Sequence, residues 1–267
     1  GNDTMTAASA TFAKFIGGDV TDCAVPNILY STVAAYDTTK TQAPANLFEA
    51  LFDTAKFPGK RALQKSPFVN LEWALMADGV APEDVYKVLG TEEGVDRAFK
   101  KLDTIKSQVV WWEAGAQAPQ LLADGEVVMT SAWNGRIANA IKEGKTFKIV
   151  WDGEAPDLDM WAIPKGTPNL DKSYEFLAFA SSAEVQSALA PHIPYGPTNK
   201  AAAAQAATTQ FRGEIFFMDG APGVEENGFQ PHHNGSRGAD ADPPTVKLWQ
   251  TCVHKRIRAL TGSTAYV

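Results

Sequence analysis

Hydrophobic and polar positions follow two different spacings along this chain. Runs of β-branched and aromatic residues predict strands over 27–36, 108–112, 126–132, 147–151 and 161–164. Apolar residues repeated every three to four positions predict helices over 46–53, 70–77, 91–106, 114–123, 135–143, 170–180 and 183–189. A further helix is expected to begin at Pro82, because proline and the acids that follow it suit a first helical turn. Strands that alternate with helices predict an α/β fold with largely parallel sheets.

Local signals mark the ends of several of these elements. Asn70 is a plausible N-cap for the helix at 70–77, and Gly125 and Gly144 should end the helices before them. The acidic run 152–159 separates two predicted strands and is typical of a solvated loop, although a carboxylate placed there could also meet a cation.

The two ends of the chain differ from its middle. The N-terminus shows neither an initiator Met nor a basic and then apolar leader pattern. After Phe217, Gly, Pro and Asn recur every few residues and leave no room for a long element. We therefore expect an atypical, largely irregular tail over 211–267.

Composition narrows the class of protein. The 267 residues suffice for one large or two modest domains, and 45% of them are apolar. A net charge of −7 without a stripe of Lys or Arg argues against nucleic acid and favours neutral or cationic ligands. The apolar runs are too short for stable membrane insertion. Whether Cys23 and Cys252 pair is left open by the sequence.

Trp133 is the first candidate for binding chemistry. It follows the predicted strand 126–132 and precedes the helix 135–143, and such strand-to-helix junctions are where open α/β sheets bind ligands. Its ring offers a π face to a small molecule, especially a cationic one. The alternative is that Trp133 is a packing residue, as large aromatic residues often are.

The sequence offers few candidates for catalytic or metal-binding motifs. The Gly144-Lys145-Thr146 segment resembles the end of a phosphate-binding loop, but it leaves a helix and lacks the earlier glycine. No Gly-x-Ser-x-Gly motif occurs, and His192 is the first histidine of the chain. His232, His233 and His254 lack the spacing of metal ligands. The sequence predicts neither a metal nor a cofactor.

Five segments together resemble the polyamine (spermidine/putrescine) family of solute-binding proteins of ABC importers. They are 111–117 (WWEAGAQ), 121–127, 132–136 (AWNGR), 159–166 (DMWAIPKG) and 193–199 (IPYGPTN), with a matching Pro-Gly-Lys turn at 57–61. No single motif is specific, but their order and spacing over roughly 10–205 agree with the family.

The resemblance implies a two-lobe α/β fold of the periplasmic-binding-protein type II, with lobe one incomplete. Lobe two would span 30–155, and partial lobe one would combine 1–29 with 156–210. The ligand would lie in a cleft over which the lobes close. It also implies a periplasmic location, a small amine ligand and a membrane permease as partner, without enzymatic activity.

The chain departs from that family in three ways. The family's N-terminal portion, with its signal peptide and first strands, has no counterpart here, and the family's C-terminal helices are replaced by the Gly- and Pro-rich tail. The loop 65–69 carries Lys65 where polyamine binders place acids. A long dication is therefore in doubt, and a smaller amine or an amino-acid-like zwitterion is an alternative.

The resemblance also assigns roles to individual residues. Trp133 would stack on the ligand, Asp159 would pair with an ammonium group, and Tyr195 would close the cleft from lobe one. Ser66 occupies a contact loop of the family. Glu113 and Gln117 flank a helix start that faces the same cleft.

Two further classes of function stay open at this point. A hydrolase or transferase would use Asp157, Asp159 or Glu113 as acid or base, since two carboxylates in one cleft can separate their pKa values. An iron- or anion-binding receptor of the same fold would draw on Tyr195 and His192.

Overall fold

The computed structural model describes residues 24–189, 192 and 194–202, which form two compact units. Unit 1 combines 24–31 with 156–202, and unit 2 is the segment 32–155. The chain passes between the units within two strands, β1 (Ala24–Asp37) and β5 (Phe147–Ala162). The predicted tail 211–267 and the cysteines lie outside the described residues.

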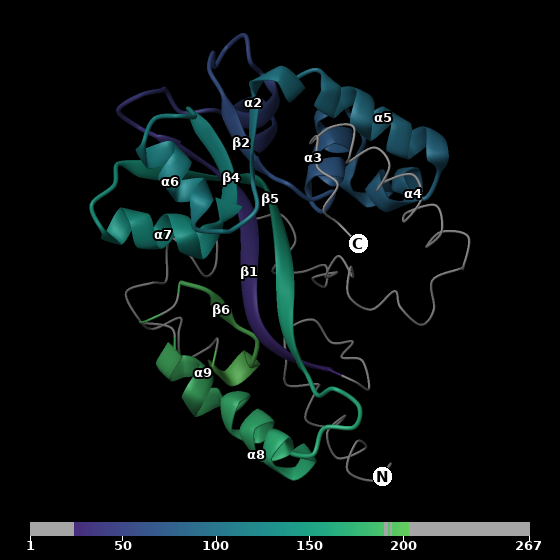
Figure 1. Ribbon diagram of the computed structural model, residues 1–267, viewed down its shortest axis with the longest axis vertical. Coiled ribbons are helices and arrows are strands. Elements are labelled where there is room, and N and C mark those ends of the chain that lie inside the picture. The colour runs from purple at the N-terminus through teal and green to yellow at the C-terminus, as the bar shows by residue number, and fades with distance from the viewer. Residues whose placement is uncertain (1–23, 190–191, 193, 203–267) are drawn as a thin grey trace. The chain divides into compact units, whose positions relative to one another are not determined.

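One mixed sheet organises the strands, in the order β3-β2-β4-β1-β5, with β6 paired to β1 (Figure 1). The other strands are β2 (Arg61–Gln64), β3 (Val109–Trp112), β4 (Met129–Trp133) and β6 (Gly196–Pro197). β2 runs parallel to β3 and β4, because helical crossovers join them. β1 is antiparallel to both β4 and β6. The expectation of largely parallel sheets was wrong here, since β1 enters unit 2 without a crossover helix.

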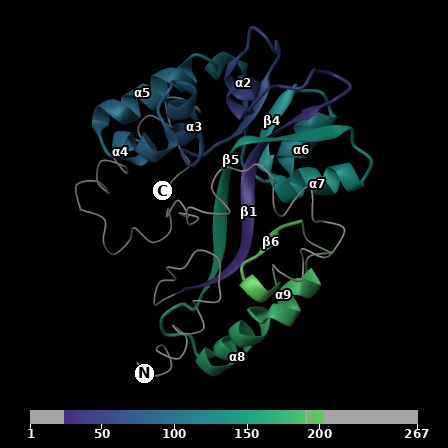
Figure 2. The same ribbon diagram turned by 180° about the vertical axis from the view of Figure 1, so that it is seen from behind.

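Unit 2 has helices on both faces of its sheet (Figures 1 and 2). Neighbouring strand residues separate into two cores: Leu63 packs with helices α2, α3 and α5, whereas Ala62 packs with α6 and α7. The helices are α2 (Leu47–Phe52), α3 (Asn70–Ala77), η1 (Pro82–Asp84), α4 (Val85–Leu89), α5 (Glu92–Asp103), η2 (Lys106–Gln108), α6 (Gln117–Ala123) and α7 (Asn134–Lys142). None of the helices in the described part of the chain is long and apolar enough to cross a membrane.

The start of α3 differs from the predicted cap. Asn70 is the first helical residue, and the cap position belongs to Val69, whose φ of 68° is unusual for a β-branched residue. The Asn70 amide instead donates to the carbonyls of Gln64 (2.7 Å) and Ser66 (2.8 Å). The side chain therefore closes the loop 64–70 from inside, which leaves it no role at the helix terminus.

β5 continues through the acidic run that the sequence predicts as a loop. Gly153 accommodates a φ of 92° within this strand, and its carbonyl accepts a hydrogen bond from Trp73 Nε1 at 3.0 Å. The long strand β1 is the neighbour of β5 in the sheet. The loop prediction was wrong because charge favours exposure but does not exclude an extended strand.

Unit 1 is organised by helices α8 (Leu170–Ala180) and α9 (Ala183–Leu189), both at the predicted bounds. Gln186 of α9 is buried and accepts hydrogen bonds from the main-chain N–H groups of Thr198 and Asn199 at 2.9 and 2.8 Å. The Thr198 hydroxyl donates to the Pro26 carbonyl on β1 at 3.0 Å. These bonds hold the segment after α9 against β1.

Candidate functional site

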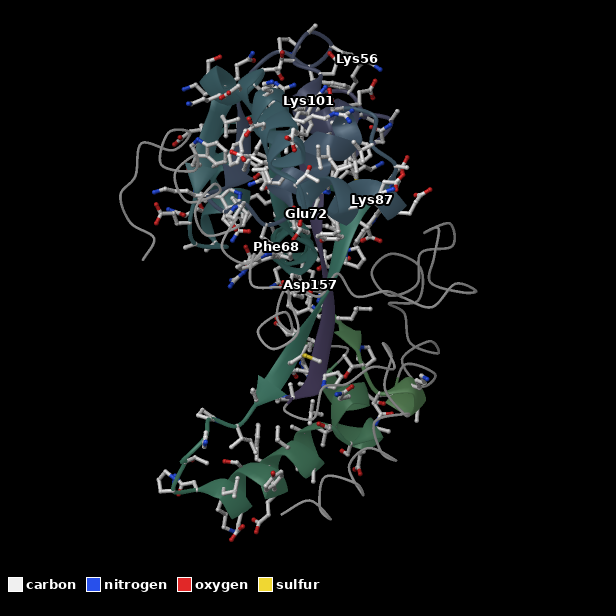
Figure 3. The ribbon with its side chains drawn as sticks, turned by 90° about the vertical axis from the view of Figure 1, so that its right-hand side faces the viewer. Lys56, Phe68, Glu72, Lys87, Lys101 and Asp157 are labelled. Atoms are coloured by element: carbon white, nitrogen blue, oxygen red, sulfur yellow. The ribbon has the colours of Figure 1, made fainter. Side chains whose placement is uncertain are left out.

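Unit 1 places two carboxylates and a tyrosine hydroxyl together. Asp157 and Asp159 are two residues apart on β5, so their side chains share one face of the strand. The Tyr30 hydroxyl, on the neighbouring strand β1, donates to Asp157 Oδ2 at 3.0 Å. Asp157 is labelled on β5 in Figure 3.

Tyr195 joins this group through the pairing of β1 with β6. Leu29 is opposite Gly196, which brings Tyr195 next to Tyr30. The two rings meet edge to face, with centroids 6.2 Å apart and planes at 68°. We call the set Tyr30, Asp157, Asp159 and Tyr195 the acidic cluster.

Electrostatics within the acidic cluster favour a bound cation. Burial, followed by the negative charge of Asp157, raises the pKa of Tyr30, so its hydroxyl remains a neutral donor. Partial loss of hydration, followed by the charge of Asp157, raises the pKa of the Asp159 carboxyl. A positive group beside both carboxylates would offset their mutual repulsion.

Unit 2 gathers the other predicted residues at one edge of its sheet. β2 is parallel to β3 and β4, so the carboxyl ends of all three strands meet there. Ser66, Glu113 and Trp133 follow or end these strands, and the Lys65 N–H donates to the Trp112 carbonyl at 2.8 Å. Edges of this kind are the usual ligand-binding positions of open α/β sheets.

Trp133 is half-buried and held by aromatic contact. Its ring meets Trp112 edge to face, with centroids 5.7 Å apart and planes at 87°. Trp112 is fixed in turn by a hydrogen bond from its Nε1 to Ser131 Oγ at 3.3 Å. Part of the Trp133 ring lies over Gly115, in the loop after β3.

Glu113, Gln117 and Ser66 each make contacts within unit 2. Lys65 Nζ lies 2.7 Å from Glu113 Oε1, and the Lys65 side chain is only 11% exposed. Gln117 Oε1 accepts from the N–H groups of Glu113 and Ala114, both at 2.8 Å. Ser66 Oγ accepts from the Phe68 N–H at 3.2 Å. These bonds shape the two loops that flank Trp133.

Two side chains were not singled out from the sequence. Tyr30 gave no signal, because its place in the acidic cluster depends on the pairing of β1 with distant segments. Arg136 lies in the first turn of α7, three residues after Trp133, which ends β4 and is the N-cap of the helix. Arg136 is exposed and has no ion-pair partner in the described part of the chain. A cation so close to the strand-to-helix junction in the sequence could have been noted as a candidate.

Metal-ligating groups do not gather within the described residues. No set of three or more His, Cys, Asp or Glu side chains there could hold a metal ion. His192 is exposed, and the other histidines, His232, His233 and His254, lie outside the described part of the chain.

Solved structures with this fold are binding proteins for small solutes. The PBP MotA of A. tumefaciens B6, in complex with glucopine, has a TM-score of 0.69 and 37% identity, covering 78% of this chain and 68% of its own. The Atu4243-GABA receptor has a TM-score of 0.69 and 31% identity, covering 96% of this chain and 73% of its own. The α/β fold is thus that of the periplasmic binding proteins.

The chain belongs to the family of bacterial extracellular solute-binding proteins, whose profile matches residues 2–212. The gamma-aminobutyric acid-binding protein of Pseudomonas aeruginosa PAO1 is 50% identical over 188 residues, which are 70% of this chain and 53% of the relative. The putrescine-binding periplasmic protein of Escherichia coli K12 is 30% identical over 89 residues, which are 30% of this chain and 24% of that protein.

This chain therefore spans about half the length, or less, of the curated relatives it matches. The family consists of solute-binding proteins rather than enzymes. The hypothesis that the carboxylates serve a hydrolase or transferase is therefore rejected. The comparisons support the broader assignment to the ABC solute-binding proteins, and the polyamine specificity expected from the sequence is not confirmed.

Proposed function

We propose that this chain is part of a periplasmic solute-binding protein that delivers a small ω-amino acid, of the size of gamma-aminobutyric acid (GABA), to an ABC permease. The acidic cluster of unit 1 is the observation that carries the proposal. The names of two relatives, a GABA-binding protein and a GABA receptor, support the ligand class. Units 1 and 2 would be the two lobes of the receptor.

The acidic cluster suits an ammonium group. An ammonium donates three hydrogen bonds, and the carboxylates of Asp157 and Asp159 are its strongest acceptors. The Tyr30 hydroxyl already donates to Asp157, which fixes the direction of that carboxylate. Tyr195 would cover the group with its ring.

A basic residue of unit 2 favours a zwitterion over a diamine. Arg136 lies in the first turn of α7, directly after the carboxyl end of β4. A ligand carboxylate would pair with Arg136, whereas the second ammonium of a diamine would be repelled by it; Lys65 is already paired with Glu113 at 2.7 Å. Trp133 would pack against the methylene groups next to that carboxylate.

A thermal-shift panel tests the ligand class. GABA, putrescine, spermidine, glucose and phosphate would each be added to the chain at the same series of concentrations. A ligand present at a hundred times its Kd stabilises the folded state by about 2.7 kcal/mol, so GABA should raise the Tm clearly. Glucose and phosphate should leave the Tm unchanged.

The same panel separates the alternatives. A larger rise in Tm with putrescine or spermidine than with GABA would favour a polyamine ligand and contradict the proposed role of Arg136. A response to glucose or phosphate alone would overturn the amine proposal, although the family assignment would stand.

A further inference from the structure

The ring of Trp133 occupies space that a side chain at position 115 would fill. A Cβ built on Gly115 would lie 2.6 Å from Trp133 Cε3 and overlap the ring. Gly115 is not among the glycines with positive φ, so its backbone would accept an alanine. The conflict is therefore confined to the indole.

The loop that carries Gly115 is held on both sides. At the start of the loop, Gln117 Oε1 accepts hydrogen bonds from two main-chain N–H groups. Glu113 forms an ion pair with Lys65, whose side chain is largely buried. The loop consequently cannot withdraw easily from the ring. Trp112 contacts the ring edge to face from the end of β3. The loop and Trp112 together fix the position of the indole.

We infer that Gly115 is a specificity-determining residue, which sets the position of the Trp133 ring and thereby the length of ligand that fits against it. The inference rests on the proposed function, because it takes Trp133 as a ligand contact. Gly115 acts through Trp133, so it is a positioning residue.

The expected effect of Gly115→Ala follows from this geometry. To regain van der Waals contact the ring would have to move away from the loop by about 1 Å. The loop side is closed, so the ring would advance into the space that the ligand needs. Longer ligands should then lose more affinity than shorter ones.

The test compares three ω-amino acids, β-alanine, GABA and 5-aminopentanoate, by calorimetric titration of the full chain. Gly115→Ala should weaken GABA binding by about tenfold, the effect of roughly 1.4 kcal/mol. It should weaken 5-aminopentanoate more than β-alanine. Gly90→Ala is the matched control, because Gly90 has a φ of −72° and its Cβ would meet only main-chain oxygens, the nearer at 3.3 Å.

A double-mutant cycle isolates the contact. In a Trp133→Leu background the bulky ring is absent, so Gly115→Ala should change GABA affinity by less than about twofold. Near-UV circular dichroism of the ligand-free chain should also change in Gly115→Ala, because the Trp112–Trp133 pair is disturbed.

Several results would overturn the inference. Equal loss for all three ligand lengths, the same loss in the Trp133→Leu background, or an unchanged dichroism spectrum would each exclude it. Should Gly115→Ala fail to fold, the double variant Gly115→Ala/Trp133→Leu should restore folding. Failure of both variants to fold would mean that the main chain itself requires glycine at position 115, which would also overturn the inference. Absence of any amine binding by the parent chain would instead refute the proposed function, while the dichroism would still test the ring contact.

Discussion

Asp157 and Asp159 differ in what surrounds them, although they share one face of β5. Asp157 accepts a hydrogen bond from the Tyr30 hydroxyl, whereas no hydrogen bond to Asp159 is found among the described residues. Asp159 is exposed, and its raised pKa reflects partial desolvation and the neighbouring charge. We therefore propose Asp159 as the carboxylate that would gain most from an added ammonium.

Asp159→Asn should weaken amine binding while leaving the fold unchanged. The amide keeps the shape of the carboxylate and removes its charge, so the loss should be about 1.5–3 kcal/mol, the range for a hydrogen bond to a charged group. Titration of GABA into both proteins measures it. Asp152→Asn, also on β5 and exposed, is the control and should bind like the parent. Unchanged affinity in Asp159→Asn would make Asp159 structural.

Acid should weaken amine binding through the same group. The pKa of Asp159 is raised in the free protein, and a bound ammonium would lower it, so binding must release a proton whenever the carboxyl is protonated. Affinity should therefore fall as the pH drops through that raised pKa, and should be restored above it. Asp159→Asn should show a smaller fall that begins at lower pH. Identical pH profiles for the two proteins would exclude Asp159 as the titrating group.

Between α2 and β2, a buried arginine holds the chain together. Arg61 begins β2, is fully buried, and donates to the carbonyls of Leu51, Asp53 and Gly59. Burial lowers the pKa of its guanidinium, which Asp53 partly offsets. A guanidinium has five N–H donors, so one side chain can donate hydrogen bonds to several main-chain carbonyls of a loop that has no regular strand or helix pairing.

Arg61→Met should destabilise unit 2 by about 2–4 kcal/mol, because several carbonyls lose their donor in a buried place. Urea unfolding followed by circular dichroism measures the difference. Arg97→Met is the control: its ion pair with Asp78 is about half exposed, so its loss should be below about 1 kcal/mol. Similar effects from both substitutions would show that the buried bonds add little to stability.

Elements with strong periodicity could be predicted from the sequence, and elements set by distant partners could not. Helices α8 and α9 have their predicted bounds. The helix predicted to begin at Thr91 does begin there, and Thr91 is its N-cap. The continuous β5 was missed because β1, its neighbour in the sheet, lies more than a hundred residues away in the sequence. Asn70 was misassigned for a similar reason, since its amide bonds to a loop rather than to its own helix.

At the scale of the whole molecule, the two units bury their helices to different degrees. Helix α5 of unit 2 has five buried residues, whereas α8 of unit 1 has none and exposes Leu170, Tyr174, Phe176 and Phe179. Local opening is easier where few apolar contacts must break.

Hydrogen exchange should reveal that difference. Amides of α5 should exchange at least about tenfold more slowly than those of α8, because α5 opens only with the core of unit 2. Mass spectrometry of proteolytic fragments after deuterium labelling resolves the two helices. Equal protection would mean that α8 is as firmly packed as α5.

Candidate site residues could be predicted only where neighbouring residues in the sequence carry the signal. Trp133 became a candidate because a strand end and a helix start adjoin it in the sequence. Tyr30 could not be found, since it meets Asp157 across 127 residues of chain. Family resemblance supplied Asp159 and Tyr195; strand pairing brings Tyr195 beside Tyr30, and Asp159 follows Asp157 by two residues on β5.

Within the described residues, unit 2 is one uninterrupted stretch, from Thr32 to Ala155, whereas unit 1 is assembled from two stretches on either side of it. A ribosome adds all of this stretch before it reaches Pro156. The first half of β1 must wait for its β6 partner until Gly196 and Pro197 have also been added. During synthesis or export, the pairing of β1 with β6 in unit 1 thus forms only after the described part of unit 2 has been made.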